Sequence, residues 1–177
     1  MTKREITALL ERLNIAMTYF EVVFAGSAIA FASLLLFTNV VLRYIFLSPI
    51  SWAEELSIYI MIWIVFVAGS GVFRNLSHLK IDLLPQVLTP VQRRYLLLFS
   101  LLVVMAFLAV FIYYSGLHTL RVYSSGQRTP NMLAPMWLTY LAMPVGSSMM
   151  FVRSLLAFYT ISIQQPDFDK NLIQNFE

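Results

Sequence analysis

Residues 22–42 read VVFAGSAIAFASLLLFTNVVL, an apolar run without a charged side chain. Three further runs also lack charge: Leu56–Phe73, Tyr95–Leu120 and Thr129–Val152. At about 1.5 Å of rise per residue, each run can cross a hydrocarbon core of about 30 Å as a helix. The chain is therefore predicted to be an all-α membrane protein with four transmembrane helices, at residues 22–42, 52–73, 91–120 and 133–160.

The composition also favours a membrane protein. Of the 177 residues, 59% are hydrophobic and 12% charged, which is too apolar for an ordinary soluble domain. The net charge is only +3 and the basic residues lie at span ends, so the pattern is not typical of nucleic-acid binding. The chain has no cysteine, which excludes disulfides and thiolate metal sites. The first run exceeds the apolar core of a signal peptide, about 7–15 residues, and predicts a retained anchor.

Three segments flank the predicted spans. Residues 2–20 place apolar side chains at helical spacing and most charges on the other side, which predicts an amphipathic helix at the membrane interface. A solvated helical extension of the first span fits the same pattern. Residues 77–90 are predicted to lie along the cytoplasmic surface, and residues 164–177 to form a cytoplasmic tail.

Several residues mark helix starts. Ser51 and Glu54 have the spacing of a capping box, which predicts that the second helix opens there. Pro90 is predicted at the first position of the third helix, where its missing N–H costs nothing. Thr129-Pro130 and Pro135 mark the entry to the fourth helix, and Pro144 predicts a kink inside it.

The distribution of Lys and Arg predicts the orientation. Nine of these residues fall at the N-terminus, in the second connection and beyond Val152, against three in the other two connections. The positive-inside rule then places both termini in the cytoplasm. Arg153 lies about 26 Å along a helix from Met136, so we expect its side chain to extend to the cytoplasmic headgroups.

Polar residues cluster at three places, where they are candidates for contact with a partner. Belt aromatics, lipid phosphate and a solvated loop are the simpler explanations. The adjacent carboxylates of the outward corner should pair with its arginine or meet a partner chain. The outward candidates are Arg43, Tyr44, Trp52, Glu54 and Glu55 in the first connection, with Arg128 and Trp137 before the fourth span. The cytoplasmic candidates are Arg74, His78, Asp82 and Arg153.

The pattern argues against enzymes and against two other classes of membrane protein. No nucleophile with a neighbouring base, phosphate loop or metal-ligand spacing is present. A respiratory anchor needs histidines within its spans for haem, but His78 and His118 fall at opposite faces. A self-contained four-span transporter acting as a homodimer needs an embedded carboxylate in its first helix, and Glu21 lies at the entrance of that span. Charges kept at the edges suggest a subunit that supports another polypeptide.

Taken together, the motifs resemble a known family over nearly the whole chain: the small membrane subunit, DctQ type, of tripartite ATP-independent periplasmic (TRAP) transporters. The resemblance rests on the order of short motifs along a four-span scaffold. They are Arg43-Tyr44, the run from Ser51 to Leu56, Arg74 with His78 and Ile81-Asp82, Gly126-Gln127, Pro135-Met136-Trp137, Tyr140-Leu141 and Pro144-Val145-Gly146.

The resemblance implies a multi-pass protein of the bacterial inner membrane that has no cofactor. Its implied partners are a large multi-span subunit of the DctM type, which carries substrate and sodium, and a periplasmic binding protein that delivers an organic acid. The small subunit would act as a scaffold for the large one. Arg43, Trp52, Glu54 and Glu55 would then shape the periplasmic face, and Arg74, His78 and Asp82 would order the cytoplasmic surface segment.

Overall fold

The computed structural model describes residues 3–73 and 90–163, and every regular element within them is helical. The predicted all-α class is therefore confirmed for the described part of the chain. The elements are α1 (Lys3–Tyr44), α2 (Ala53–Gly69), the 3-10 helix η1 (Ser70–Phe73), α3 (Pro90–Ser125), α4 (Trp137–Tyr140) and α5 (Ala142–Ile163).

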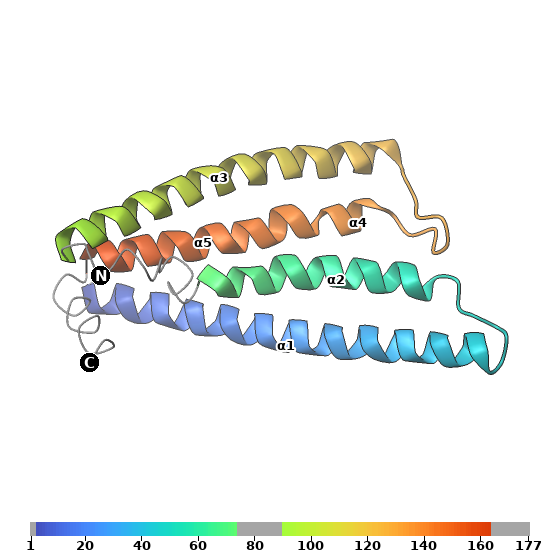
Figure 1. The fold of residues 1–177 in the computed structure, drawn as a ribbon. Coiled ribbons are helices and arrows are strands. Elements are labelled where there is room, and N and C mark those ends of the chain that lie inside the picture. Colours follow the sequence, from blue (N-terminus) through green and yellow to red (C-terminus); the bar gives the residue numbers. More distant parts are fainter. Residues whose placement is uncertain (1–2, 74–89, 164–177) are drawn as a thin grey trace.

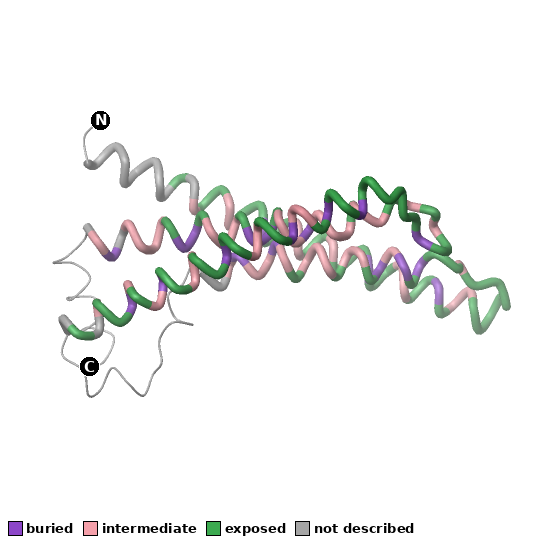
Figure 2. Tube along the Cα trace, turned by 90° about the horizontal axis from the view of Figure 1, so that it is seen from above, coloured by how far each residue is buried: buried purple, intermediate pink, exposed green. Residues whose placement is uncertain are grey.

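The long helices lie side by side in one layer, in the order α1, α2, α5, α3, and α4 continues the line of α5 (Figure 1). Segments 45–52 and 126–136 lie together at one end, which we call the loop end. Helix α1 begins and α5 ends at the opposite, terminal end. Seen from above, the helices spread apart at the terminal end and draw together in the middle of the molecule (Figure 2).

Three helices are long and apolar enough to cross a membrane: Asn14–Tyr44, Arg94–Ser125 and Trp137–Tyr159. The remaining predicted span, at residues 52–73, corresponds to α2, which has 17 residues and is shorter than the other three. A 17-residue helix is about 26 Å long, at the lower limit for a transmembrane helix. The structure thus supports three spans directly and places α2 between two of them in the layer.

Helix α1 is continuous over 42 residues. The predicted boundary between an interfacial helix at residues 2–20 and a span beginning at Val22 is not marked by a break in the helix. An unbroken helix fits both interpretations, an interfacial helix that leads into the first span and a solvated extension of it, so the interfacial position of residues 2–20 stays a prediction. The predicted surface segment at 77–90 lies outside the described residues except for Pro90, and the predicted tail at 164–177 lies wholly outside them.

The two predicted helix starts differ in what the structure says of them. Helix α3 is helical from Pro90, the first residue described after residue 73, so its predicted start there stays a prediction. The capping box at Ser51 was wrong: Trp52 is the N-cap residue of α2, without a side-chain hydrogen bond, and the helix begins at Ala53. The reason is that the Glu54 carboxylate pairs with Arg43 instead of returning to the backbone of Ser51.

The fourth predicted span is interrupted near its start, as the proline pattern indicated. Helix α4 ends at Tyr140, the chain turns at Leu141 and α5 begins at Ala142, so Pro144 lies in the first turn of α5. Two residues later, a Cβ atom on Gly146 would lie 2.5 Å from the carbonyl oxygen of Phe66. The backbone of α5 therefore approaches the backbone of α2 at Gly146 more closely than a residue with a Cβ atom would allow.

A single layer leaves most of the helix surface uncovered. The side chains buried in the described part of the chain include Leu101 and Leu108 of α3 and Ile161 of α5, two helices that pack on one another. Large apolar side chains stand exposed along α1 and α3, among them Phe37, Leu34, Phe99 and Phe107. Such a surface needs a lipid or protein environment rather than water.

Candidate partner interface and the polar contacts behind it

The first connection is held to the end of α1 by a buried amide. The Asn39 side-chain oxygen accepts a hydrogen bond from the backbone N–H of Ile50 at 2.8 Å, and Asn39 is buried. The turn places Leu47 at a φ of 52°, in the left-handed region. Asn39 thereby fixes where the chain enters α2, and with it the residues of the outward corner.

Arg43 and Glu54 form an ion pair across this corner, with 3.1 Å between Nη2 and Oε1. The expectation that these charges pair locally is confirmed for this pair. Both side chains remain more than half exposed, at 52% and 57%. An exposed pair of this kind contributes little to stability, about 0–1 kcal/mol. Arg43 and Glu54 are therefore presented at the surface, and so are Tyr44 and Trp52 beside them.

Glu55 has a different position from its neighbour, because its side chain is buried and turned inward. Its Oε2 accepts hydrogen bonds from the backbone N–H groups of Asn131 at 3.1 Å and Met132 at 3.0 Å. Its Oε1 accepts one from the hydroxyl of Tyr59 at 3.1 Å. The carboxylate thus ties the start of α2 to the loop before α4, and it does not lie on the exposed surface of the outward corner.

The loop at residues 127–136 also carries its own internal hydrogen bonds. The buried Thr129 hydroxyl accepts a bond from the Ala134 N–H at 3.0 Å, and the backbone N–H of Thr129 donates to the Ala134 carbonyl at 2.9 Å. Arg128 pairs with Pro135 in an isolated antiparallel bridge. The Arg128 side chain is exposed and donates a long hydrogen bond, 3.4 Å, to the Leu133 carbonyl. The loop is thereby a folded unit that presents Arg128 outward.

Aromatic side chains line the same end of the molecule. Trp137 meets Tyr123 of α3 edge to face, with 5.6 Å between the ring centroids. His118 makes a similar contact with Tyr140, at 4.8 Å. These contacts join α3 to α4 and place Trp137 half-buried against the protein, whereas Trp52 is more exposed.

The expectation for Arg153 was wrong. Its side chain does not extend outward: it is 1% exposed and forms an ion pair with Glu21, which is 5% exposed, with 2.7 Å between Nη2 and Oε2. Arg153 Nη2 also donates to the Thr18 hydroxyl at 3.3 Å, and the Ser70 hydroxyl donates to Glu21 Oε1. The Glu21 carboxylate on α1 keeps the Arg153 side chain inside the protein, because each charge would otherwise be unpaired within a candidate span.

Sequence reasoning missed this cluster because it treated Glu21 as a residue at the edge of the first span. The available signal was the pair of opposite charges, Glu21 near the start of one apolar run and Arg153 near the end of another on the same predicted side. Asn39 and Ser70 were missed as well, and their signal was a polar side chain inside an apolar run. Three predicted cytoplasmic residues, Arg74, His78 and Asp82, lie outside the described residues.

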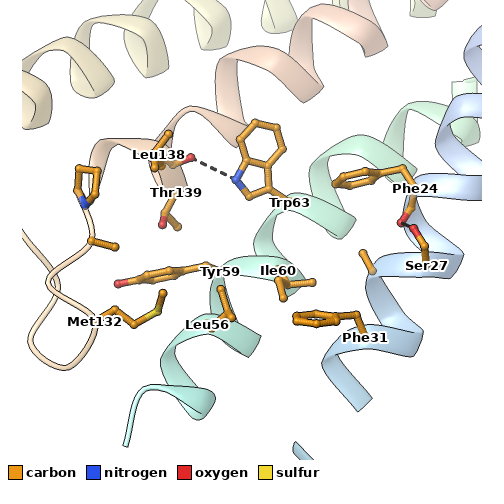
Figure 3. Close-up of a pocket in the computed structure, with 13 residues that line it drawn as sticks. Phe24, Ser27, Phe31, Leu56, Tyr59, Ile60, Trp63, Met132, Leu138 and Thr139 are labelled. Carbon is orange, nitrogen blue, oxygen red and sulfur yellow. Dashed lines mark hydrogen bonds between the residues drawn. The ribbon is translucent and has the colours of Figure 1, made fainter. Parts of the chain in front are cut away.

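A groove of about 680 Å³ opens between α1, α2, α4 and the loop at 127–136, and we call it the α1–α2 groove (Figure 3). Two of its polar side chains are bonded to backbone carbonyls, and the first is Trp63, whose indole N–H donates to the Leu138 carbonyl at 3.2 Å. The Ser27 hydroxyl donates to the Phe24 carbonyl at 3.0 Å. The lining residues are Phe24, Ser27, Ala28, Phe31, Leu56, Tyr59, Ile60, Trp63, Met132, Ala134, Pro135, Leu138 and Thr139.

The family model and the relatives that match this chain all belong to one family. The family model described as "Tripartite ATP-independent periplasmic transporters, DctQ component" matches residues 32–162. The chain is 36% identical over 105 residues to the C4-dicarboxylate TRAP transporter small permease protein DctQ of Rhodobacter capsulatus, covering 59% of this chain and 46% of that protein. It is 42% identical over 64 residues to a putative TRAP transporter small permease protein of Haemophilus influenzae, covering 36% of this chain and 40% of that protein. Each match spans less than half of the relative.

Proposed function

Since the chain belongs to the DctQ family, the small permease component of TRAP transporters, we propose that it acts as a scaffold for a large multi-span subunit of the DctM type. In this proposal the large subunit carries an organic acid together with sodium, and a periplasmic binding protein delivers the acid. The scaffold itself carries neither. Its contribution is to hold the static part of the large subunit in the membrane.

The observation that carries this proposal is the single-layer arrangement of the helices (Figure 1). A pathway for a polar solute through a membrane must be enclosed by polar groups on several sides. A layer one helix thick has no interior in which to enclose it. The buried charges of Glu21 and Arg153 neutralise one another within the layer. This geometry supports a subunit whose faces pack against lipid and another protein.

We also propose that α2 crosses the membrane, which gives four spans with both termini on the cytoplasmic side of the bacterial inner membrane. Two observations support this topology. Lys and Arg are more frequent on the predicted cytoplasmic side, nine residues against three. Segments 45–52 and 126–136 lie at the same end of the layer, as two periplasmic connections would.

The candidate interface residues then divide by position. Arg43, Tyr44, Glu54 and Arg128 are exposed at the loop end and are proposed to meet the periplasmic binding protein or the large subunit. Trp52, exposed, and Trp137, half-buried, would contribute at the membrane boundary. Glu55 is buried behind these residues, where it hydrogen-bonds the loop at 127–136 and fixes that loop to the start of α2. Arg74, His78 and Asp82 retain their proposed role of ordering the cytoplasmic surface segment, and lipid headgroups would meet the same surface.

The proposal is tested by purifying the tagged chain from detergent-solubilised native membranes and identifying the proteins that accompany it by mass spectrometry. We expect one larger many-span protein in a stoichiometric amount. An unrelated tagged membrane protein of similar size serves as the control for non-specific recovery. Recovery of the chain only as a stable homodimer would contradict the scaffold role and favour a self-contained transporter.

The outward corner can be tested in the same preparation. The single reversal Glu54→Lys places two positive charges beside one another and should weaken contact with the binding protein. Exchanging the pair, with Arg43→Glu and Glu54→Arg, restores the local ion pair but inverts each position. Uptake of the transported acid that is unchanged in both variants would rule out a role for this corner in partner contact.

A further inference from the structure

The interruption of the fourth predicted span receives a hydrogen bond from another helix. Leu138 is one of the last four residues of a helix, α4, and the carbonyls of such residues have no donor within that helix. A carbonyl at membrane depth needs a partner from a neighbouring element instead. Here the indole N–H of Trp63 on α2 donates to the Leu138 carbonyl at 3.2 Å (Figure 3). Trp63 therefore supplies a donor close to the point where the span is interrupted.

Trp63 is the last of three polar side chains on one face of α2. Glu55, Tyr59 and Trp63 are four residues apart, so they follow one another along one side of the helix over about 12 Å. Glu55 Oε2 accepts the backbone N–H groups of Asn131 and Met132. Its Oε1 accepts the hydroxyl of Tyr59. We call Glu55, Tyr59 and Trp63 the α2 clamp, which meets backbone donors with a carboxylate and a backbone carbonyl with an indole.

The α2 clamp bonds both ends of the segment at residues 131–138, and α3 contacts α4 from the other side (Figure 1). On that side Trp137 and Tyr140 meet rings of α3 edge to face. Such ring pairs tolerate centroid distances of about 4.5–7 Å, whereas a hydrogen bond weakens steeply below an angle of about 120°. The directional restraint on α4 therefore comes from α2.

We propose that Trp63 is a positioning residue: through its indole N–H, and together with Glu55, it sets the place of α4 and of the loop at 127–136 relative to α2. This inference rests on the proposed function, in which Arg128 of the same loop meets a partner protein. The role requires the N–H group and not only the ring. A ring without an N–H would fill similar space and leave the Leu138 carbonyl without this donor.

The first experiment measures the place of the loop in the purified subunit. The chain contains no cysteine, so spin labels can be attached at Leu34→Cys and Gln127→Cys, two exposed positions on α1 and in the loop. Pulsed electron paramagnetic resonance then gives the distance between the labels. We expect Trp63→Phe to widen the distance distribution about twofold. Tyr113→Phe is the matched control, because it also removes one polar group from an aromatic ring, at an exposed position on α3.

The second experiment asks whether Glu55 and Trp63 act together. With isotope-labelled tryptophan, the indole N–H groups are observed by NMR, and Trp63→Phe identifies the signal of Trp63. We expect Glu55→Gln to make this N–H exchange with solvent about fivefold faster or more, because loosening one end of the clamp loosens the other. Glu54→Gln is the control, since Glu54 pairs with Arg43. Indole exchange that Glu55→Gln leaves unchanged would contradict the joint action.

Recovery of the large subunit through the tag connects these measurements to the proposed function. We expect recovery to fall about threefold in Trp63→Phe and to stay at the wild-type level in Tyr113→Phe. An unchanged distance distribution in Trp63→Phe overturns the inference and leaves the proposed function intact. A widened distribution with wild-type recovery also overturns it, because the place of Arg128 would then not matter for the partner. If the wild type recovers no large subunit, the proposed function fails, and the distances and exchange rates decide the positioning role by themselves.

Discussion

The two ion pairs of the described chain, Arg43–Glu54 and Glu21–Arg153, occupy opposite environments and should behave in opposite ways. The outward pair is screened by solvent, whereas the Glu21–Arg153 pair is enclosed by α1, α5 and the end of α2. Two further nitrogens of the Arg153 guanidinium, Nε and Nη1, are buried without a partner in the part of the chain that the structure describes. The Glu21 carboxylate therefore offsets most of the free-energy cost of burying the Arg153 charge.

Replacing Arg153 by Gln should destabilise the subunit strongly, because it leaves the Glu21 carboxylate buried without its counter-charge. Breaking a buried pair costs about 3–5 kcal/mol, whereas breaking an exposed one costs about 0–1 kcal/mol. The measurement is thermal unfolding of the purified subunit, followed by tryptophan fluorescence. Arg43→Gln is the control. Equal lowering of the melting temperature by the two substitutions would contradict the assigned burial.

A double substitution separates the charge from the packing. Glu21→Gln combined with Arg153→Met removes both charges and keeps side chains of similar length. We expect it to recover much of the stability lost in Arg153→Gln, because replacing a buried pair by neutral groups is often tolerated. A double variant that is as unstable as the single one would show that the hydrogen bonds from Ser70 to Glu21 and from Arg153 to Thr18, rather than charge, dominate this cluster.

Glu55 should control the order of the loop at residues 127–136. Glu55→Ala removes the acceptor for two backbone N–H groups, and hydrogen bonds to a charged group are worth about 1.5–3 kcal/mol each. We therefore expect amide hydrogen exchange at Asn131 and Met132 to become at least about tenfold faster. Exchange measured by mass spectrometry over a peptide covering this loop tests it. Glu54→Ala should leave the same peptide unchanged, and a similar acceleration there would contradict the distinction between the two carboxylates.

At the scale of the elements, the crossing of α5 over α2 depends on Gly146. Gly146→Ala introduces a methyl group that must displace the backbone at Phe66, so the two helices should separate and the melting temperature should fall. Gly116→Ala is the matched control on α3, because nothing lies within 4 Å of its Cβ position. There the higher helix propensity of alanine should be neutral or stabilising, by up to about 1 kcal/mol. The same thermal assay applies, and a harmless Gly146→Ala would contradict the close crossing.

The elements also show what could be predicted from the sequence. Hydropathy located the long helices because residence in a membrane requires apolar composition, which a single chain displays directly. The capping box at Ser51 failed, and Glu54 instead has a partner outside the box, Arg43 on α1. The prediction for Arg153 failed because another helix of the layer, α1, supplied the carboxylate.

The candidate interface was predictable only as a region. The motifs indicated that residues 43–55 matter, but the sequence does not distinguish exposed Glu54 from buried Glu55. That difference arises from the fold of a loop about 76 residues further along the chain. The α1–α2 groove has no signature in the sequence either, because its walls come from two helices and a distant loop. Such features appear only when the packing is known.

At the scale of the whole molecule, the layer raises the question of what covers it. Compact membrane proteins bury many helix faces against one another, whereas here each helix packs mainly on its neighbours in the row. Exposed apolar residues run along α1 and α3, which form the two edges of the layer. A flat array of this kind gains stability and a defined position when a larger protein packs on one face. Lipid then covers the other face.

The topology of the layer gives the last prediction. Ser48 and Gln127 lie in the two segments at the loop end. If α2 crosses the membrane, both segments face the periplasm, so a membrane-impermeant maleimide added to intact cells with a permeabilised outer membrane should label Ser48→Cys and Gln127→Cys alike. Arg12→Cys, predicted to be cytoplasmic, should react only after lysis. If α2 does not cross, the direction of α3 reverses and the two positions fall on opposite sides of the membrane. Labelling of only one of them would therefore refute the four-span topology, whatever the orientation of the chain.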